Sequence, residues 1–125
     1  MPRVQSVSLS ASPPYQARPY QTVKLSAQAT GGHNPEYAFY YRIPGRTGWR
    51  LIGDTGYSNV STIYVYADAE FNTQIAVIAR SKGSPSSYDT HHIIDYRFRW
   101  SATGSASSDL QELMKDNAEV YIIEN

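Results

Sequence analysis

Apolar and polar side chains alternate without interruption in Thr22-Val23-Lys24-Leu25-Ser26-Ala27-Gln28-Ala29. A period of two residues is typical of a β-strand that buries one face, here the face carrying valine, leucine and the alanines. After a turn-rich loop at residues 31–35, the alternation resumes from Glu36 to Ile43, with aromatic side chains on one face. Both segments are therefore expected to be strands whose apolar faces pack into a core.

The same pattern recurs along the chain, with proline and glycine clusters between the segments. The expected strands are residues 4–11, 22–29, 36–43, 49–52, 59–66, 73–80 and 88–100. Seven short strands without any helical period in this region predict an all-β fold, a seven-stranded antiparallel immunoglobulin-like β-sandwich of about 100 residues.

Length and charge exclude several classes of protein. The chain has 125 residues, which suits a single core, and its 11 basic and 11 acidic residues cancel. Zero net charge argues against nucleic-acid binding. The absence of cysteine excludes disulfides and thiolate chemistry, and no apolar run reaches the ~20 residues of a membrane-spanning helix, so we expect no membrane insertion by this chain.

The composition changes after Trp100. Residues 101–108 are rich in serine, alanine and glycine, which is typical of a linker, and Ser108 with Gln111 has the spacing of a helix-capping box. A short helix is expected over residues 109–117, with Leu110, Leu113 and Met114 on one stripe, followed by a short apolar run at 120–123 that could pair at a sheet edge. We thus divide the chain into a sandwich, 1–100, and a tail, 101–125.

Several segments resemble an immunoglobulin-like module that is repeated in bacterial exported and cell-surface proteins. The resemblance rests on Leu9-Ser10-Ala11-Ser12-Pro13, on residues 23–32 and 35–42, on Trp49, on the stretch 54–61 and on Val77-Ile78-Ala79-Arg80 with the turn behind it. It implies a sandwich fold, an extracellular or cell-surface location, and a spacer, adhesion or binding role without catalysis. Phe71-Asn72-Thr73 stands where these modules often have Gly-x-Tyr, which argues against a tyrosine-corner contact there.

Three aromatic residues are candidates for a carbohydrate-binding platform: Tyr40, Trp49 and Tyr57. Tyr40 alternates with Phe39 and Tyr41, so its ring faces away from theirs. The simplest expectation for Trp49 is a place in the core, because large aromatic side chains bury much apolar surface. Exposure of Trp49 beside Tyr40 would instead favour stacking of a sugar ring.

The sequence gives little support for a metal site or an active site. His91 and His92 point to opposite faces of a strand, so they cannot both bind one ion without a bulge. His91 could bind one together with Asp89 or Asp95, but two or three ligands on a regular strand are weak support for a metal site. Asp54, Asp68 and Glu70 offer oxygen atoms for calcium, but without a calcium-loop motif. No nucleophile motif or phosphate-binding loop occurs, so we expect no metal, no cofactor and no enzyme activity.

These observations predict a non-catalytic structural or protein-interaction module of a bacterial surface protein or filament. The tail would dock on its own sandwich, on another copy or on a partner protein, or else begin a following segment. Its assembly residues would be Leu110, Leu113, Met114, Tyr121, Ile122 and Ile123. The alternative is a carbohydrate-binding module that uses surface aromatics.

Overall fold

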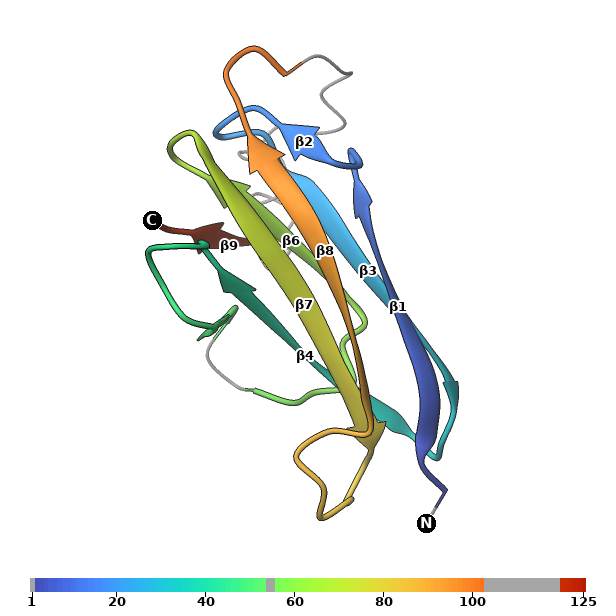
Figure 1. Cartoon of the computed structure of the whole chain (residues 1–125). Coiled ribbons are helices and arrows are strands. Elements are labelled where there is room, and N and C mark those ends of the chain that lie inside the picture. Colours follow the sequence, from blue (N-terminus) through green and yellow to red (C-terminus); the bar gives the residue numbers. More distant parts are fainter. Residues whose placement is uncertain (1, 54–55, 103–119) are drawn as a thin grey trace.

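The computed structural model describes residues 2–53, 56–102 and 120–125. Nine strands occur in these residues: β1 (Val4–Ser12), β2 (Gln16–Ala17), β3 (Val23–Gly31), β4 (Pro35–Arg42), β5 (Arg50–Leu51), β6 (Thr62–Ala67), β7 (Phe71–Ser81), β8 (Thr90–Phe98) and β9 (Val120–Ile123). They form a four-stranded sheet in the order β1-β3-β6-β9 and a five-stranded sheet in the order β2-β8-β7-β4-β5. The chain is thus an all-β sandwich, and its long strands run along the length of the molecule (Figure 1).

The sheets are mixed, whereas seven antiparallel strands were expected. Strand β2 pairs in parallel with β8, and β9 pairs in parallel with β6. Both are short strands at sheet edges, and sequence alternation cannot reveal such pairing because it depends on distant segments. The helix expected at 109–117 lies outside the described residues.

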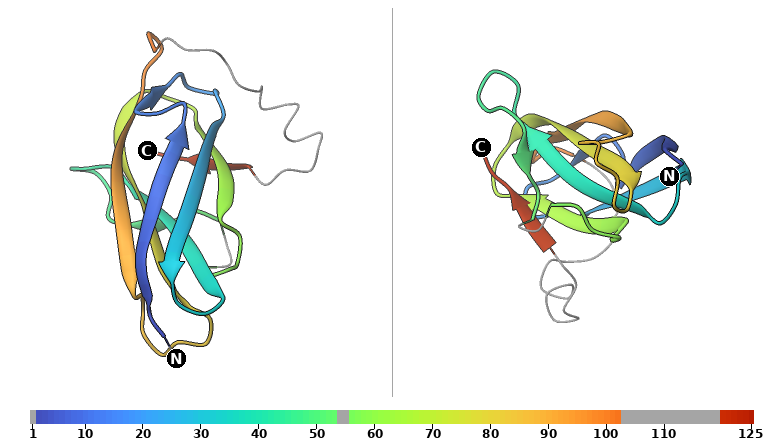
Figure 2. Two further views of the ribbon diagram at one scale, coloured as in Figure 1. Left: turned by 90° about the vertical axis from the view of Figure 1, so that its right-hand side faces the viewer. Right: turned by 90° about the horizontal axis from the view of Figure 1, so that it is seen from below.

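The inner face expected for residues 22–29 is confirmed, and the other long strands also bury one face. Val23 and Leu25 of β3 and Ile75 and Val77 of β7 are completely buried, together with Phe98 of β8. Figure 2 shows the two sheets in side and end views, and these residues lie in the space between them. Burial of such side chains supplies the main driving force for folding.

One inner position differs from the simple alternation. A strict alternation over residues 4–11 would place Val4 on the face opposite Val7 and Leu9, yet it is buried with them. The register of β1 against β3 shifts between Val4 and Ser6, and this irregularity turns the Val4 side chain inward.

The two ends of the sandwich are closed by different contacts. At the amino end of β1, the Asp89 carboxylate accepts hydrogen bonds from the backbone N–H groups of Val4 and Ser81. Farther along, the Tyr96 hydroxyl donates to the carbonyl oxygen of Pro13 over 2.6 Å. These bonds fix β1 against the five-stranded sheet, to which its backbone is not paired as a strand.

Candidate functional site

The outer face of the five-stranded sheet is organised in rows of side chains that cross three strands. Residues directly opposite each other in neighbouring strands share a face, so each row can be read from the strand register. One row is Tyr40–Ala76–Ile93, and the next towards the β7–β8 turn is Ala38–Ile78–His91. These rows give the middle of the outer face an apolar surface.

A hollow of about 340 Å³ lies on these rows. We call it the aromatic pocket; its lining residues are Tyr40, Trp49, Ala76, Ile78, Tyr88, His91 and Ile93. Trp49, Tyr88 and Ile93 are 39%, 46% and 40% exposed, which is unusual for large apolar side chains that lie together. The rings of Tyr88 and His91 meet edge to face, with centroids 5.7 Å apart.

A polar row borders the aromatic pocket towards the carboxyl end of β8. Arg42 Nε donates to Gln74 Oε1 over 2.6 Å, and Gln74 Nε2 donates to Asp95 Oδ1 over 3.0 Å. The Arg42 guanidinium also lies over the Trp49 ring, 4.8 Å from its centroid. The row thereby fixes the orientation of the tryptophan that walls the pocket.

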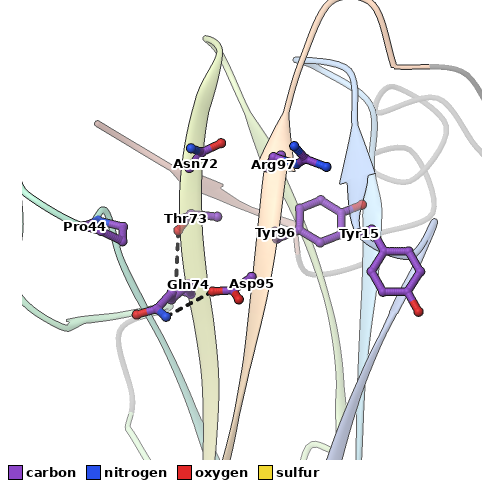
Figure 3. Close-up of a pocket in the computed structure, with 8 residues that line it drawn as sticks. All are labelled: Tyr15, Pro44, Asn72, Thr73, Gln74, Asp95, Tyr96 and Arg97. Atoms are coloured by element: carbon purple, nitrogen blue, oxygen red, sulfur yellow. Dashed lines mark hydrogen bonds between the residues drawn. The ribbon is translucent and has the colours of Figure 1, made fainter.

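A second hollow, of about 500 Å³, begins on the other side of this row. We call it the polar pocket, and Figure 3 shows the residues that line it: Tyr15, Pro44, Asn72, Thr73, Gln74, Asp95, Tyr96 and Arg97. Asn72 and Arg97 are opposite each other on β7 and β8, so they form the next outward-facing row. The outer face therefore carries two adjoining hollows, one apolar and one polar.

The structure brings together two of the three aromatic residues singled out from the sequence. Tyr40 and Trp49 both line the aromatic pocket. The expectation of a core position for Trp49 was wrong, because the residue lies in the connection just before β5, outside the space between the sheets. The core is instead filled by side chains of regular strands, among them Tyr37, Phe39 and Tyr41.

Tyr57 lies in a different hollow. It borders a space of about 600 Å³ together with Glu36 and Lys82. The Arg80 guanidinium lies 3.9 Å from the centroid of the Tyr57 ring, and the Tyr57 hydroxyl donates to the carbonyl oxygen of Ser87. Burial raises the pKa of Tyr57 to about 12, despite the opposing influence of Arg80. These contacts give Tyr57 a structural role beside the Glu36–Arg80 ion pair.

The structure describes three of the six tail residues that were singled out for assembly. Tyr121, Ile122 and Ile123 belong to β9, and Ile123 is completely buried in the core. The three residues therefore form part of the four-stranded sheet of this sandwich. Leu110, Leu113 and Met114 lie outside the described residues.

Several of the groups considered for metal binding make other contacts. His92 Nδ1 accepts a hydrogen bond from the backbone N–H of Leu9, while His91 faces the aromatic pocket. Glu70 Oε2 accepts one from the backbone N–H of Trp100. Within residues 2–53, 56–102 and 120–125, no three histidine or acidic side chains form a group that could hold a metal ion. Asp54 is not among these residues.

Sequence reasoning missed Tyr88, His91 and Ile93 as partners of Tyr40 and Trp49. A signal was present, because Ala76 and Ile78 are apolar on the outward face of β7, where polar residues are usual. The pairing of β8 with β7, which the sequence does not show, places Ile93 beside Ala76.

A second group of aromatic residues, two of them exposed, lies elsewhere. The Tyr20 ring is 6.3 Å from the ring of Tyr66 and 6.3 Å from that of Trp100. None of the three lines the aromatic pocket. Trp100, 55% exposed, therefore offers a matched comparison for Trp49.

Comparison with known proteins does not place the chain in a family. No family model matches the sequence, and no curated protein matches it significantly. The fold is therefore described by its architecture, an all-β sandwich compatible with the immunoglobulin-like class. In the described part of the chain, no helix is long and apolar enough to cross a membrane.

Proposed function

We propose that this chain is a non-catalytic recognition module that binds carbohydrate on the outer face of its five-stranded sheet. The single observation that carries the proposal is the gathering of Tyr40, Trp49 and Tyr88 around one apolar hollow, with the polar row of Arg42, Gln74 and Asp95 at its border. The resemblance noted above supports the further part of this proposal, that the chain is an immunoglobulin-like module of a bacterial exported or cell-surface protein.

The chemistry of the pocket suits a sugar ring. The faces of a pyranose ring carry C–H groups that pack on an aromatic ring, while its hydroxyl groups point outward and need hydrogen-bond partners. Aromatic side chains, Ala76 and two isoleucines supply the apolar part here. At the border of the pocket, the amide of Gln74 and the carboxylate of Asp95 supply donors and acceptors.

The position of the pocket favours carbohydrate over an extended peptide. Peptides that bind to sheets usually add a strand at a free edge, where backbone groups are available. The aromatic pocket instead lies on the face of β4, β7 and β8, whose backbone groups are paired with one another. Recognition at this place must therefore proceed through side chains.

The proposal is tested by affinity electrophoresis of the full chain in gels that contain soluble neutral and acidic polysaccharides. At least one polysaccharide should retard the protein, and Trp49→Ala or Tyr40→Ala should weaken this binding about tenfold or more, as for aromatic residues at the centre of an interface. Trp100→Ala serves as the control, because it removes a tryptophan that is also exposed but lies outside the pocket. Equal binding by the Trp49 and Trp100 variants would refute the proposal.

Tryptophan fluorescence gives an independent measurement. In Trp100→Phe the only remaining indole is that of Trp49, so a change of its emission on titration with the retarding polysaccharide reports contact at the pocket. An unchanged emission at saturating polysaccharide would place the binding elsewhere.

A second candidate function, assembly through the tail, is supported by one observation only. Strand β9 pairs with β6 at a sheet edge, and such an edge can in principle accept the same strand from another copy. Light scattering on the full chain over a concentration series tests this function, and a constant monomer mass would argue against it.

A further inference from the structure

The aromatic and polar pockets form one continuous surface along β7 and β8. The outward-facing rows follow one another along β7 at every second residue, from Ile78–His91 at one end to Asn72–Arg97 at the other. Residues 72–78 of an extended strand span ~20 Å at about 3.3 Å per residue. A ligand that lies along the strands can therefore occupy both pockets at once.

One arginine lines the polar pocket, and two more bond to residues that line it. Arg97 is exposed and lines the pocket, and its side chain makes no hydrogen bond or ion pair within the described residues. Arg99 Nη2 donates to Asn72 Oδ1 over 2.7 Å at the same end of the face. Arg42 uses its Nε for Gln74, and no hydrogen bond from its Nη groups occurs among the described residues.

Carboxylates of the described residues form no ion pair with these guanidinium groups. In the described part of the chain, ion pairs within 4.0 Å join Arg3 to Asp89 and Arg80 to Glu36 only. Asp95 is the single acidic residue that lines the polar pocket, and it accepts its hydrogen bond from the neutral Gln74. Within the lining, the charge of Arg97 is offset by that of Asp95, so the excess of positive charge comes from Arg42 and Arg99, which bond to the lining residues Gln74 and Asn72.

We propose that the polar pocket binds an anionic substituent, a carboxylate or a sulfate, of a glycan whose ring stacks in the aromatic pocket. The ligand class is then an acidic polysaccharide. The planar fork of a guanidinium donates two parallel hydrogen bonds to an oxyanion. Neutral sugars have no oxyanion to accept them. This inference rests on the proposed function and adds the charge of its ligand.

Substitution of Asp95 provides a test in which the affinity for an acidic ligand should increase rather than decrease. An acidic ligand is attracted by Arg97 and repelled by Asp95, whose side chains are both exposed in the same pocket. Asp95→Asn removes the repulsion, and the amide oxygen can still accept the hydrogen bond from Gln74. The variant should therefore bind an acidic glycan more tightly than the natural protein does.

The experiment compares probes that differ only in charge. Polygalacturonate is compared with its methyl ester, and a sulfated galactan with its desulfated form, by calorimetry with the full chain at low and high salt. One acidic member should bind about tenfold tighter than its neutral counterpart, with the difference shrinking at high salt. The pair that shows the difference identifies carboxylate or sulfate as the anion.

Single substitutions identify the residues that cause the preference for the acidic probe. Arg97→Gln should abolish the preference for the acidic probe and leave binding of the neutral probe unchanged, whereas Asp95→Asn should increase the preference. Lys24→Gln is the matched control, since this exposed cation lies on β3 in the other sheet. It should leave both affinities unchanged.

The alternative outcomes separate the two proposals. Equal affinity for acidic and neutral probes, with both still lost in Trp49→Ala, would overturn this inference and leave the proposed function intact. Failure of every polysaccharide to bind would refute the proposed function itself and this inference with it. Tighter binding of a single-stranded oligonucleotide through Arg97 would show that the arginines serve phosphate groups, and would overturn the inference as well.

Discussion

The guanidinium of Arg42 lies 4.8 Å from the centroid of the Trp49 ring, and its Nε is held by Gln74. Arg42 is the outward-facing residue at the end of β4, while Trp49 precedes β5, so the contact bridges the turn between two paired strands. An exposed tryptophan outside a regular strand is thereby held at the wall of the aromatic pocket. This relationship explains how a pocket can be ordered without burial of its largest ring.

Trp49→Ala should change the stability of the protein little. The residue is exposed, and loss of its contact with Arg42 should cost about 0.5–1 kcal/mol of the free energy of unfolding. Urea unfolding monitored by circular dichroism measures this value, with Trp100→Ala for comparison. A loss of several kcal/mol would mean that Trp49 belongs to the core after all.

Ile123→Ala should be strongly destabilising. The side chain is fully buried, and its truncation should lower the free energy of unfolding by about 2–5 kcal/mol, as for other large core residues. Ile122→Ala, at a half-buried position of the same strand, should cost less than about 1 kcal/mol. Urea midpoints that are equal for the two variants would show that β9 does not pack against the core as described.

Asp89→Asn should alter the dependence of stability on pH. The hydrogen bond from the backbone N–H of Val4, and after it the bond from Ser81 and the charge of Arg3, hold the pKa of Asp89 below its ordinary value of 3.8. The carboxylate therefore stabilises the fold fully above this ordinary value, and its contribution is lost as the pH falls through the lower pKa of the folded state.

Thermal melts of the natural protein and Asp89→Asn between pH 2 and 7 test this prediction. The difference in melting temperature should be largest at neutral pH and should shrink towards the acidic end. A difference that stays constant down to the lowest pH would mean that the charge of Asp89 is not what fixes β1.

Gly32→Ala should destabilise the protein more than Gly45→Ala. Both glycines have positive φ, of 81° and 82°, which costs an alanine roughly 1–2 kcal/mol. A Cβ atom at residue 32 would also lie 2.7 Å from Val4 Cγ2, whereas nothing lies within 4 Å of one at residue 45. Denaturant unfolding of both variants isolates the effect of this clash, and equal losses would exclude it.

The strands and their inner faces could be predicted because they depend on local alternation alone. Val23 and Leu25 were assigned to the core from their spacing, and the structure confirms them. Val4 could not be assigned in this way, because the register shift beside it depends on how β1 meets β3. Local patterns thus identify a strand but not the irregularities that its partner imposes.

The candidate site could be predicted only in part for the same reason. Tyr40 lies within a regular strand, so its outward direction followed from the alternation, whereas Trp49 lies outside any strand and offered no such period. Tyr88 and Ile93 join Tyr40 only because β8 pairs with β7 and β7 with β4. A surface site of this kind arises from non-local pairing, which a single sequence does not reveal.

The parallel pairing of β6 with β9 bears on the order of events during folding. The hairpin of β7 and β8 joins segments close in the chain, but β9 reaches β6 only after a long stretch has been spanned, and such contacts form slowly. Until they form, β6 presents an unpaired edge to which another chain can add. Refolding should therefore yield more monomer from dilute solution, since intramolecular closure then outpaces collisions between chains.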